Sequence, residues 1–104
     1  MDRIESNAFK KWLNKFKDPV TKARIVARIN RLMEGLPGDV QPVGQGVSEL
    51  RLHFGSGYRI YFHQRHNVLI LLLNGGDKSS QQRDIQAAQQ MLNEWSNRYG
   101  RDIY

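Results

Sequence analysis

The sequence predicts an α+β fold, in which an N-terminal helical hairpin packs on a small antiparallel β-sheet and a C-terminal helix follows. Residues 6–34 repeat apolar side chains at helical spacing, and residues 79–100 do so again. Between them, residues 49–73 hold two alternating segments and one apolar segment, as strands do. The predicted order is (β)ααβββα, with helices and strands in separate blocks, which is typical of this class.

Length and composition are those of one ordinary globular domain. The chain has 104 residues, of which 39% are hydrophobic and 25% charged, so we expect a single domain over residues 1–104. The apolar run Val68–Leu73 is far shorter than the roughly 18 residues that span a bilayer. The first residues lack a secretory signal, and there is no cysteine for disulfides or thiolate zinc sites. We expect a cytoplasmic protein with no membrane partner.

Positive charge is concentrated in the first third of the chain. The net charge is +6, from 16 Lys and Arg against 10 Asp and Glu. Residues 1–35 hold nine basic and four acidic residues, whereas residues 36–78 balance to +1 and residues 79–104 to zero. Such a segment attracts phosphates without specific contacts. A solvated helix face with extra lysines explains the charge equally well.

A short edge strand at residues 1–5 and two helices are predicted first. Ser6 is a suitable N-cap for the first helix, and Asp18 with Pro19 starts the second, which ends near Glu34 before Gly35. Their apolar stripes are Phe9, Trp12, Leu13 and Phe16, then Ile25, Ile29, Leu32 and Met33. Aromatic residues at helical spacing indicate core rather than a binding surface.

The sheet is predicted after a loop at residues 36–47, which is rich in Gly and Pro. Residues 49–54 and 58–65 alternate around a turn at Gly55–Gly57, and residues 68–73 are apolar throughout, as expected for a central strand covered on both faces. The inward side chains are Leu50, Leu52 and Phe54, then Tyr58, Ile60 and Phe62.

The last helix is predicted to begin at a capping box formed by Ser79 and Gln82, shortly after Gly75 and Gly76 end the sheet. Gly100 is predicted to end this helix, and residues 101–104 have no assignment. Its buried positions are Ile85, Ala88, Leu92, Trp95 and Tyr99.

Candidate functional residues lie on the polar faces of the two alternating strands and after the third. They are Arg51, His53, Arg59, Tyr61 and His63, with Lys78 beyond the last strand. Arginine binds two phosphate oxygens at once, Tyr or His stacks on a base, and His exchanges a proton near neutral pH, so the set suits a phosphodiester. Which side chains share a face depends on strand register.

Each candidate also has a plainer interpretation. Arg59 could pair with Glu49 across the strands, the histidines could face solvent, and Tyr61 could cap an edge of the core. No familiar metal-ligand spacing, serine-nucleophile elbow or phosphate-loop motif occurs. We therefore expect no metal and no cofactor.

Four segments carry a resemblance to a known family: S-E-L-R-L (48–52), G-Y-R-I-Y-F (57–62), L-I-L-L-L-N-G-G-D-K (69–78) and Q-R-D-I-Q-A-A (82–88). In this order they resemble the RelE/ParE superfamily of toxin–antitoxin toxins, and within it the HigB-like, phage-derived addiction module killer proteins. The resemblance implies a microbial-RNase-like fold and a type II toxin. It also implies metal-independent cleavage of mRNA on the ribosome, by attack of the 2′-hydroxyl on the adjacent phosphate. The implied partners are a helix-turn-helix antitoxin, through which alone operator DNA is bound, the ribosome and mRNA.

The same resemblance implies roles for five residues. Arg59 and Lys78 would stabilise the phosphate, and Arg51 and His53 match basic positions on the preceding strand. His53 is then the proton-transfer candidate, and Tyr61 a stacking or orienting group.

The chain departs from the family in two respects. Residues 36–78 are less basic than in RelE. Family members also place catalytic groups in the C-terminal segment, where only Tyr99, Arg101, Asp102 and Tyr104 could substitute. A ParE-like gyrase inhibitor without catalysis and an inactive binding module therefore stay open as alternatives.

Overall fold

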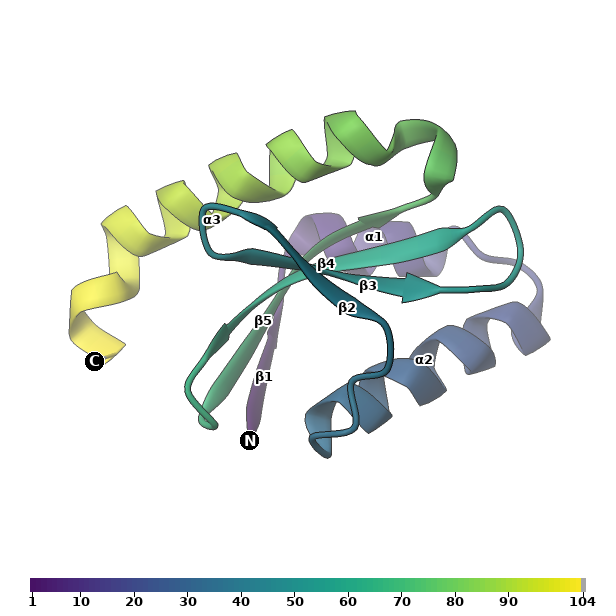
Figure 1. Cartoon of the computed structure of the whole chain (residues 1–104), viewed down its shortest axis with the longest axis horizontal. Helices are drawn as coiled ribbons and strands as arrows, with labels where there is room; N and C mark the ends of the chain where they lie inside the picture. The colour runs from purple at the N-terminus through teal and green to yellow at the C-terminus, as the bar shows by residue number, and fades with distance from the viewer. Residues whose placement is uncertain (104) are drawn as a thin grey trace.

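A five-stranded sheet lies between two helices on one face and a long helix on the other (Figure 1). This computed structural model describes the backbone of residues 1–103 and the side chains of residues 1–98. The elements are β1 (Asp2–Glu5), α1 (Asn7–Asn14), α2 (Pro19–Met33), β2 (Val40–Gly44), β3 (Val47–Leu52), β4 (Tyr58–Arg65), β5 (Leu69–Gly76), the 3-10 helix η1 (Lys78–Ser80) and α3 (Gln81–Ile103). The predicted α+β class is confirmed.

The strand order of the sheet is β1-β5-β4-β3-β2. Strands β3, β4 and β5 pair antiparallel, as predicted, and β2 also pairs antiparallel with β3, whereas β1 runs parallel to β5 with Asp2 opposite Leu69. The sheet is therefore mixed. A parallel neighbour requires a long crossover, which α1, α2 and the following hairpins provide.

Residues 40–44 form an edge strand, where the sequence predicted only loop. Val40 lies opposite Leu50 on β3, and the register shifts between Pro42 and Gly44. Proline is tolerated on an edge strand because no ladder hydrogen bond is lost there. This short bulged strand lacks the alternation that identifies strands in a sequence.

The first core lies between the sheet and the helices α1 and α2. Its buried members are all apolar: Phe9, Ile25, Ile29, Leu32, Leu50, Leu52, Ile60, Phe62, Ile70 and Leu72. Trp12, Phe16 and Tyr58 add an aromatic group at its border, with edge-to-face ring contacts at centroid distances of 5.0 Å between Trp12 and Phe16 and between Phe16 and Tyr58. These positions agree with the predicted stripes.

The second core lies between the sheet and α3. It contains Val47, Tyr61, Leu71, Leu73, Ala88 and Leu92, with Val43, Ile85, Met91 and Trp95 packed around them. Strand β5 contributes to both cores, which confirms that it is a central strand covered on both faces. Val68 was predicted to belong to this buried strand, but it precedes β5 and is 54% exposed.

The boundaries of α3 also differ from the prediction. Asp77, rather than Ser79, is the N-cap: it caps η1 by accepting from the Ser79 amide at 2.9 Å, and Ser80 completes the capping box. The helix continues through Gly100 to Ile103, since a glycine inside a helix costs only about 1 kcal/mol. The side chain of Tyr99 lies outside the described residues. Within the described part of the chain, no helix combines the length and apolarity that a membrane span requires.

Candidate functional site

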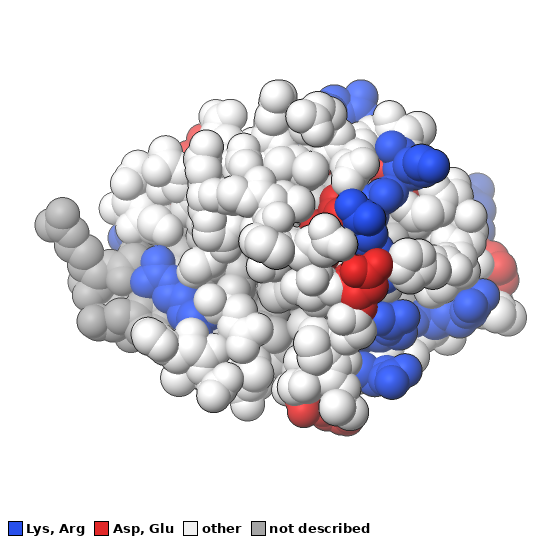
Figure 2. Space-filling model, viewed as in Figure 1, with Lys and Arg blue, Asp and Glu red and all other residues white. Residues whose placement is uncertain are grey.

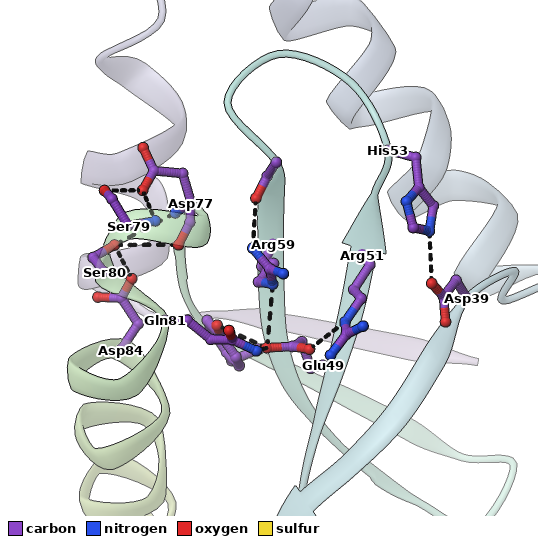
Figure 3. Close-up of polar contacts among 12 residues, drawn as sticks. Asp39, Glu49, Arg51, His53, Arg59, Asp77, Ser79, Ser80, Gln81 and Asp84 are labelled. Atoms are coloured by element: carbon purple, nitrogen blue, oxygen red, sulfur yellow. Dashed lines mark hydrogen bonds and ion pairs between the residues drawn. The ribbon is translucent and has the colours of Figure 1, made fainter.

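The register of β3 and β4 brings three of the predicted site residues onto the sheet face that α3 covers. Arg51 lies opposite Arg59, and Glu49 lies opposite Tyr61. Two arginines directly across a strand pair repel each other, so this arrangement needs a compensating charge. Figure 3 shows Glu49 between Arg51 and Arg59.

Glu49 is the centre of this group, and its side chain is fully buried at 0% exposure. Its Oε1 accepts from Arg51 Nε at 2.8 Å. Its Oε2 accepts from the Tyr61 hydroxyl and from Gln81 Nε2, both at 3.0 Å. The carboxylate thereby joins β3, β4 and the first residue of α3. We call Glu49, Arg51, Arg59, Tyr61 and Gln81 the Glu49 cluster.

Arg59 is the more buried of the two arginines, with 8% of its surface exposed. Its Nε lies 3.5 Å from Glu49 Oε2, and its Nη1 donates to the carbonyl of Gly57 at 3.0 Å. The pairing with Glu49 that the sequence left open is therefore present. With two arginines and one carboxylate, the cluster keeps a formal charge of +1.

The surroundings shift two pKa values in opposite directions. Burial raises the pKa of Glu49, but hydrogen bonds from Arg51, Gln81 and Tyr61 outweigh it and hold that pKa below its usual value. Burial and then the nearby charge of Glu49 raise the pKa of Tyr61 well above its usual value. Tyr61 is therefore a protonated hydrogen-bond donor near neutral pH, and its hydroxyl donates to Glu49.

Tyr61 has no exposed ring face, because its side chain is fully buried in the second core. Stacking on a base needs a free face, so this geometry does not support the stacking role. The orienting role stays a prediction. The sequence pattern put Tyr61 on the polar side of β4, and only the packing of α3 makes that side an interior.

His53 lies apart from the Glu49 cluster, beyond the end of β3 (Figure 3). Its Nε2 is 2.6 Å from Asp39 Oδ2, just before β2. Its side chain is 70% exposed. The structure thus separates this candidate from Arg59 and Tyr61, and gives it a carboxylate partner that the sequence did not indicate.

Lys78 lies close to Arg59, on the other side of Gly57. A Cβ built at Gly57 would be 3.2 Å from Lys78 Cβ and 3.5 Å from Arg59 Nη1. The amide of Lys78 also donates to the Ser56 carbonyl at 3.3 Å. The β3–β4 turn therefore brings together two of the predicted cations, although they are 19 residues apart in the sequence.

Sequence reasoning missed how central Glu49 is, and missed Gln81. Glu49 shares a face of its strand with Arg51 and so was expected to face solvent, and Gln81 reaches it from an element 32 residues later. Asn74 is another buried polar residue on β5 at 8% exposure, and its Nδ2 donates to the Asp84 carbonyl at 3.1 Å. The one signal in the sequence was that Glu49 is an acidic residue in a pair of strands whose other charged residues are basic.

Positive charge gathers at one end of the molecule. Figure 2 shows Lys and Arg mainly on the half that holds the β3–β4 turn and the α1–α2 connection in Figure 1. Most of the Asp and Glu visible in this view lie on the same half, among the more numerous Lys and Arg. Among the side chains of residues 1–98, no three His, Asp or Glu residues approach closely enough to hold a metal ion.

Comparisons with known proteins cover most of the chain. A family model of phage-derived Gp49-like proteins (DUF891) matches residues 11–93. An uncharacterized protein of Haemophilus influenzae is 46% identical over 86 residues, which are 83% of this chain and 87% of that relative. The family match extends from α1 into α3 and includes the whole Glu49 cluster and Lys78.

Proposed function

The chain belongs to the phage-derived Gp49-like family, which is associated with toxin–antitoxin systems, and we propose that it is the toxin of a type II pair. We assign it to the HigB-like branch of the RelE/ParE superfamily. Its action is cleavage of mRNA on the ribosome, which stops translation. Its partner is a helix-turn-helix antitoxin, and operator DNA is bound only through that antitoxin.

The observation that carries this proposal is the convergence of cations around the β3–β4 turn. Arg51 is fixed by Glu49 yet has about a third of its side chain exposed, at 34%. Lys78 is exposed beside the same turn. Arg59 stabilises this turn by donating to the carbonyl of Gly57. Fixed cations that need no rearrangement are what a phosphorane-like transition state requires.

The reaction needs an acid and a base besides the cations. The 2′-oxygen loses its proton to the base and forms a bond to phosphorus. The bond from phosphorus to the 5′-oxygen breaks, and the acid protonates that oxygen. Arg51 and Lys78 neutralise the charge that develops on the phosphate oxygens, with Arg59 behind them. His53 is the proposed proton-transfer group, because it is exposed and Asp39 orients its ring.

The test is primer-extension mapping of mRNA cut sites after induction of the protein in cells. Arg51→Ala and Lys78→Ala should each reduce the cut yield about a hundredfold, by analogy with loss of one oxyanion donor. Lys78 is exposed and forms no ion pair among the described residues, whereas Arg51 donates to the buried Glu49 carboxylate, so the Arg51→Ala yield is compared at equal amounts of folded protein. Arg59→Ala is less suitable, because Arg59 is itself buried and pairs with the buried Glu49 carboxylate.

Matched controls are Arg31→Ala and Lys11→Ala, two exposed cations on α2 and α1. These variants should cut mRNA at the wild-type yield and sites. If Arg51→Ala and Lys78→Ala also behave as wild type, or if induction leaves mRNA intact, the endoribonuclease proposal is wrong.

A non-catalytic alternative is favoured by one specific observation. Arg59 and Tyr61 are buried and bonded to Glu49, which is how residues with a purely structural role are arranged. Growth arrest with a DNA-damage response and intact mRNA would indicate a ParE-like gyrase inhibitor. Normal growth on induction would indicate an inactive binding module.

A further inference from the structure

A cleft of about 450 Å³ opens at the end of β5, between the end of α1 and the start of α3. Its volume is within the range of about 300–1,000 Å³ that small-ligand sites occupy. The residues that matter to its chemistry are Trp12, Lys15, Tyr58, Asp77, Arg83 and Asp84. None of them belongs to the Glu49 cluster.

Two glycines give the cleft its shape. The ring of Trp12 packs directly on Gly75, and the Asp84 carboxylate packs on Gly76, where an added Cβ would overlap either one. The end of β5 can therefore bring an aromatic side chain and a carboxylate to the same cleft. Flat apolar rings beside hydrogen-bonding groups suit a nucleobase.

The charged groups of the cleft differ in how far they are already used. Both oxygens of Asp77 accept hydrogen bonds, Oδ1 from Ser79 and Oδ2 from Ser56. Asp84 accepts from Ser80 through Oδ2, and its Oδ1 has no donor among the described residues. Lys15 and Arg83 are exposed, and neither forms an ion pair within the described part of the chain. The cleft thus offers one free acceptor and two free cations.

The cleft adjoins the proposed cleavage site. Ser56 belongs to its wall and to the β3–β4 turn, and its Oγ donates to Asp77 Oδ2 at 3.1 Å. The carbonyl of the same Ser56 accepts from the Lys78 amide. An RNA strand whose phosphate lies at Lys78 and Arg51 therefore reaches the cleft by passing over this turn.

We infer that this cleft binds one nucleotide of the RNA next to the cleaved phosphate, and that it selects a base with an exocyclic amino group. The amino group of adenine, cytosine or guanine donates to Asp84. Uracil has no exocyclic amino group and cannot make this hydrogen bond. Lys15 and Arg83 bind the phosphate of that nucleotide. This inference rests on the proposed function for its substrate, but its binding test does not require cleavage.

The first experiment measures binding with dinucleotides that cannot be cleaved. Uniformly ¹⁵N-labelled protein is titrated with 2′-O-methyl ApA and UpU, and the Trp12 indole and the Gly75 and Gly76 amides report on the cleft. ApA should move these resonances and bind about tenfold more tightly than UpU, as one hydrogen bond to a charged group allows. Asp84→Asn should remove that preference, because an amide also offers a donor.

Glu94→Gln is the matched control, since it makes the same change of charge at an exposed position on the same helix. It should keep the preference for ApA. Equal binding of ApA and UpU to the wild-type protein, or no shift at the three reporters, would overturn the inference even if Asp84→Asn does not fold. The inference would also be overturned if only the antitoxin, and neither dinucleotide, shifted the three reporter resonances. The cleft would then be a protein-docking site.

The second experiment separates this inference from the proposed function. In the cut-site map, Asp84→Asn should change the base found beside the cut. An unchanged base preference would overturn the role of Asp84 and leave the nuclease proposal intact. If the wild-type protein cuts no mRNA, the nuclease proposal fails and the titration alone decides what the cleft binds.

Discussion

The two faces of the sheet are built on different principles. Against α1 and α2, all ten buried residues of the core are apolar. Against α3, the interior also holds Glu49, Arg59 and Asn74. Burying a charge costs several kcal/mol unless it is paired and hydrogen-bonded. The first face can therefore supply stability by burial alone, whereas the second depends on the ion pairs and hydrogen bonds of the Glu49 cluster.

The contrast separates a face that needs only apolar burial from a face whose charges must be paired. A purely apolar second face would be simpler to stabilise, since replacing a buried ion pair by hydrophobic residues is often neutral or favourable. The Glu49 carboxylate holds Arg51 and Arg59 close together despite their repulsion. We expect the changes below to affect the two faces differently.

The largest effect is expected from Glu49→Ala. It should lower the free energy of unfolding by about 3–5 kcal/mol, because it leaves the buried Arg59 without a counter-charge. Leu50→Ala, the next residue on the same strand, faces the first core and should cost a similar 2–5 kcal/mol, roughly, through the cavity it creates. Urea unfolding followed by circular dichroism measures both.

The double variant Glu49→Met with Arg59→Met distinguishes the two mechanisms. It should recover most of the loss caused by Glu49→Ala, because no charge is then left unpaired. A double variant as unstable as Glu49→Ala would mean that the cluster stabilises by its shape alone, and the contrast between the two faces would disappear.

A smaller effect is expected from removing single hydroxyl groups on the two faces. Tyr61→Phe should cost about 1–3 kcal/mol, because the buried Glu49 carboxylate loses a donor. Tyr58→Phe, on the same strand but beside the first core, should change stability by less than about 0.5 kcal/mol. Equal losses in urea unfolding would show that the Tyr61 hydroxyl adds nothing beyond packing.

The pH dependence of stability should follow from Glu49. Its pKa in the folded chain is held below the value of about 4.3 that an unfolded chain gives, so its ionised form favours folding. That contribution to stability is complete when the pH is above the pKa of Glu49 in the unfolded chain. It is lost as the pH falls through the pKa of Glu49 in the folded chain. The stability difference between wild type and Glu49→Gln should thus be constant above about pH 5 and shrink below about pH 4.

Asp18 and Asp77 also have lowered pKa values, through hydrogen bonds from Thr21 and from Ser79 respectively. Both remain in each protein of that comparison, so their effects cancel in the difference. A difference that grows on acidification would contradict the assignment of Glu49 as the ionised member of the cluster.

A modest effect on stability is expected at these two N-caps, Asp18 before α2 and Asp77 before η1. Asp18→Ala and Asp77→Ala should lower the melting temperature slightly and to a similar extent. Only Asp77→Ala should also reduce mRNA cutting, because it releases Ser56 beside Lys78. Equal cutting by both variants would show that Lys78 does not depend on this cap.

The core of this fold was predictable because it depends on local periodicity. The stripe of α2 and the alternation of β4 each identify their buried residues without knowledge of their neighbours. β2 was missed because Pro42 and Gly44 interrupt its alternation, and its pairing with β3 is a tertiary property. The N-cap was predicted at Ser79, two residues after its true position at Asp77, because Ser79 matches the same capping motif.

The candidate site was predictable in its residue types but not in its geometry. Alternation placed Arg51, Arg59 and Tyr61 on polar sides of strands, but strand register decided which of them meet. The burial of Glu49 depends on α3, a helix that begins 32 residues later with Gln81. The distance of His53 from the cluster likewise follows from the end of β3 at Leu52.

The parallel pairing of β1 with β5 has a consequence for the order of folding. Asp2 donates to the carbonyl of Val68, and the Ser6 amide donates to that of Leu72, across more than 60 residues of sequence. Contacts between distant segments slow folding, because a long loop must close before they form. During translation, β1 leaves the ribosome long before its partner strand has been made. A nascent chain therefore cannot complete its sheet, and with it the surface around Lys78, until synthesis has passed β5.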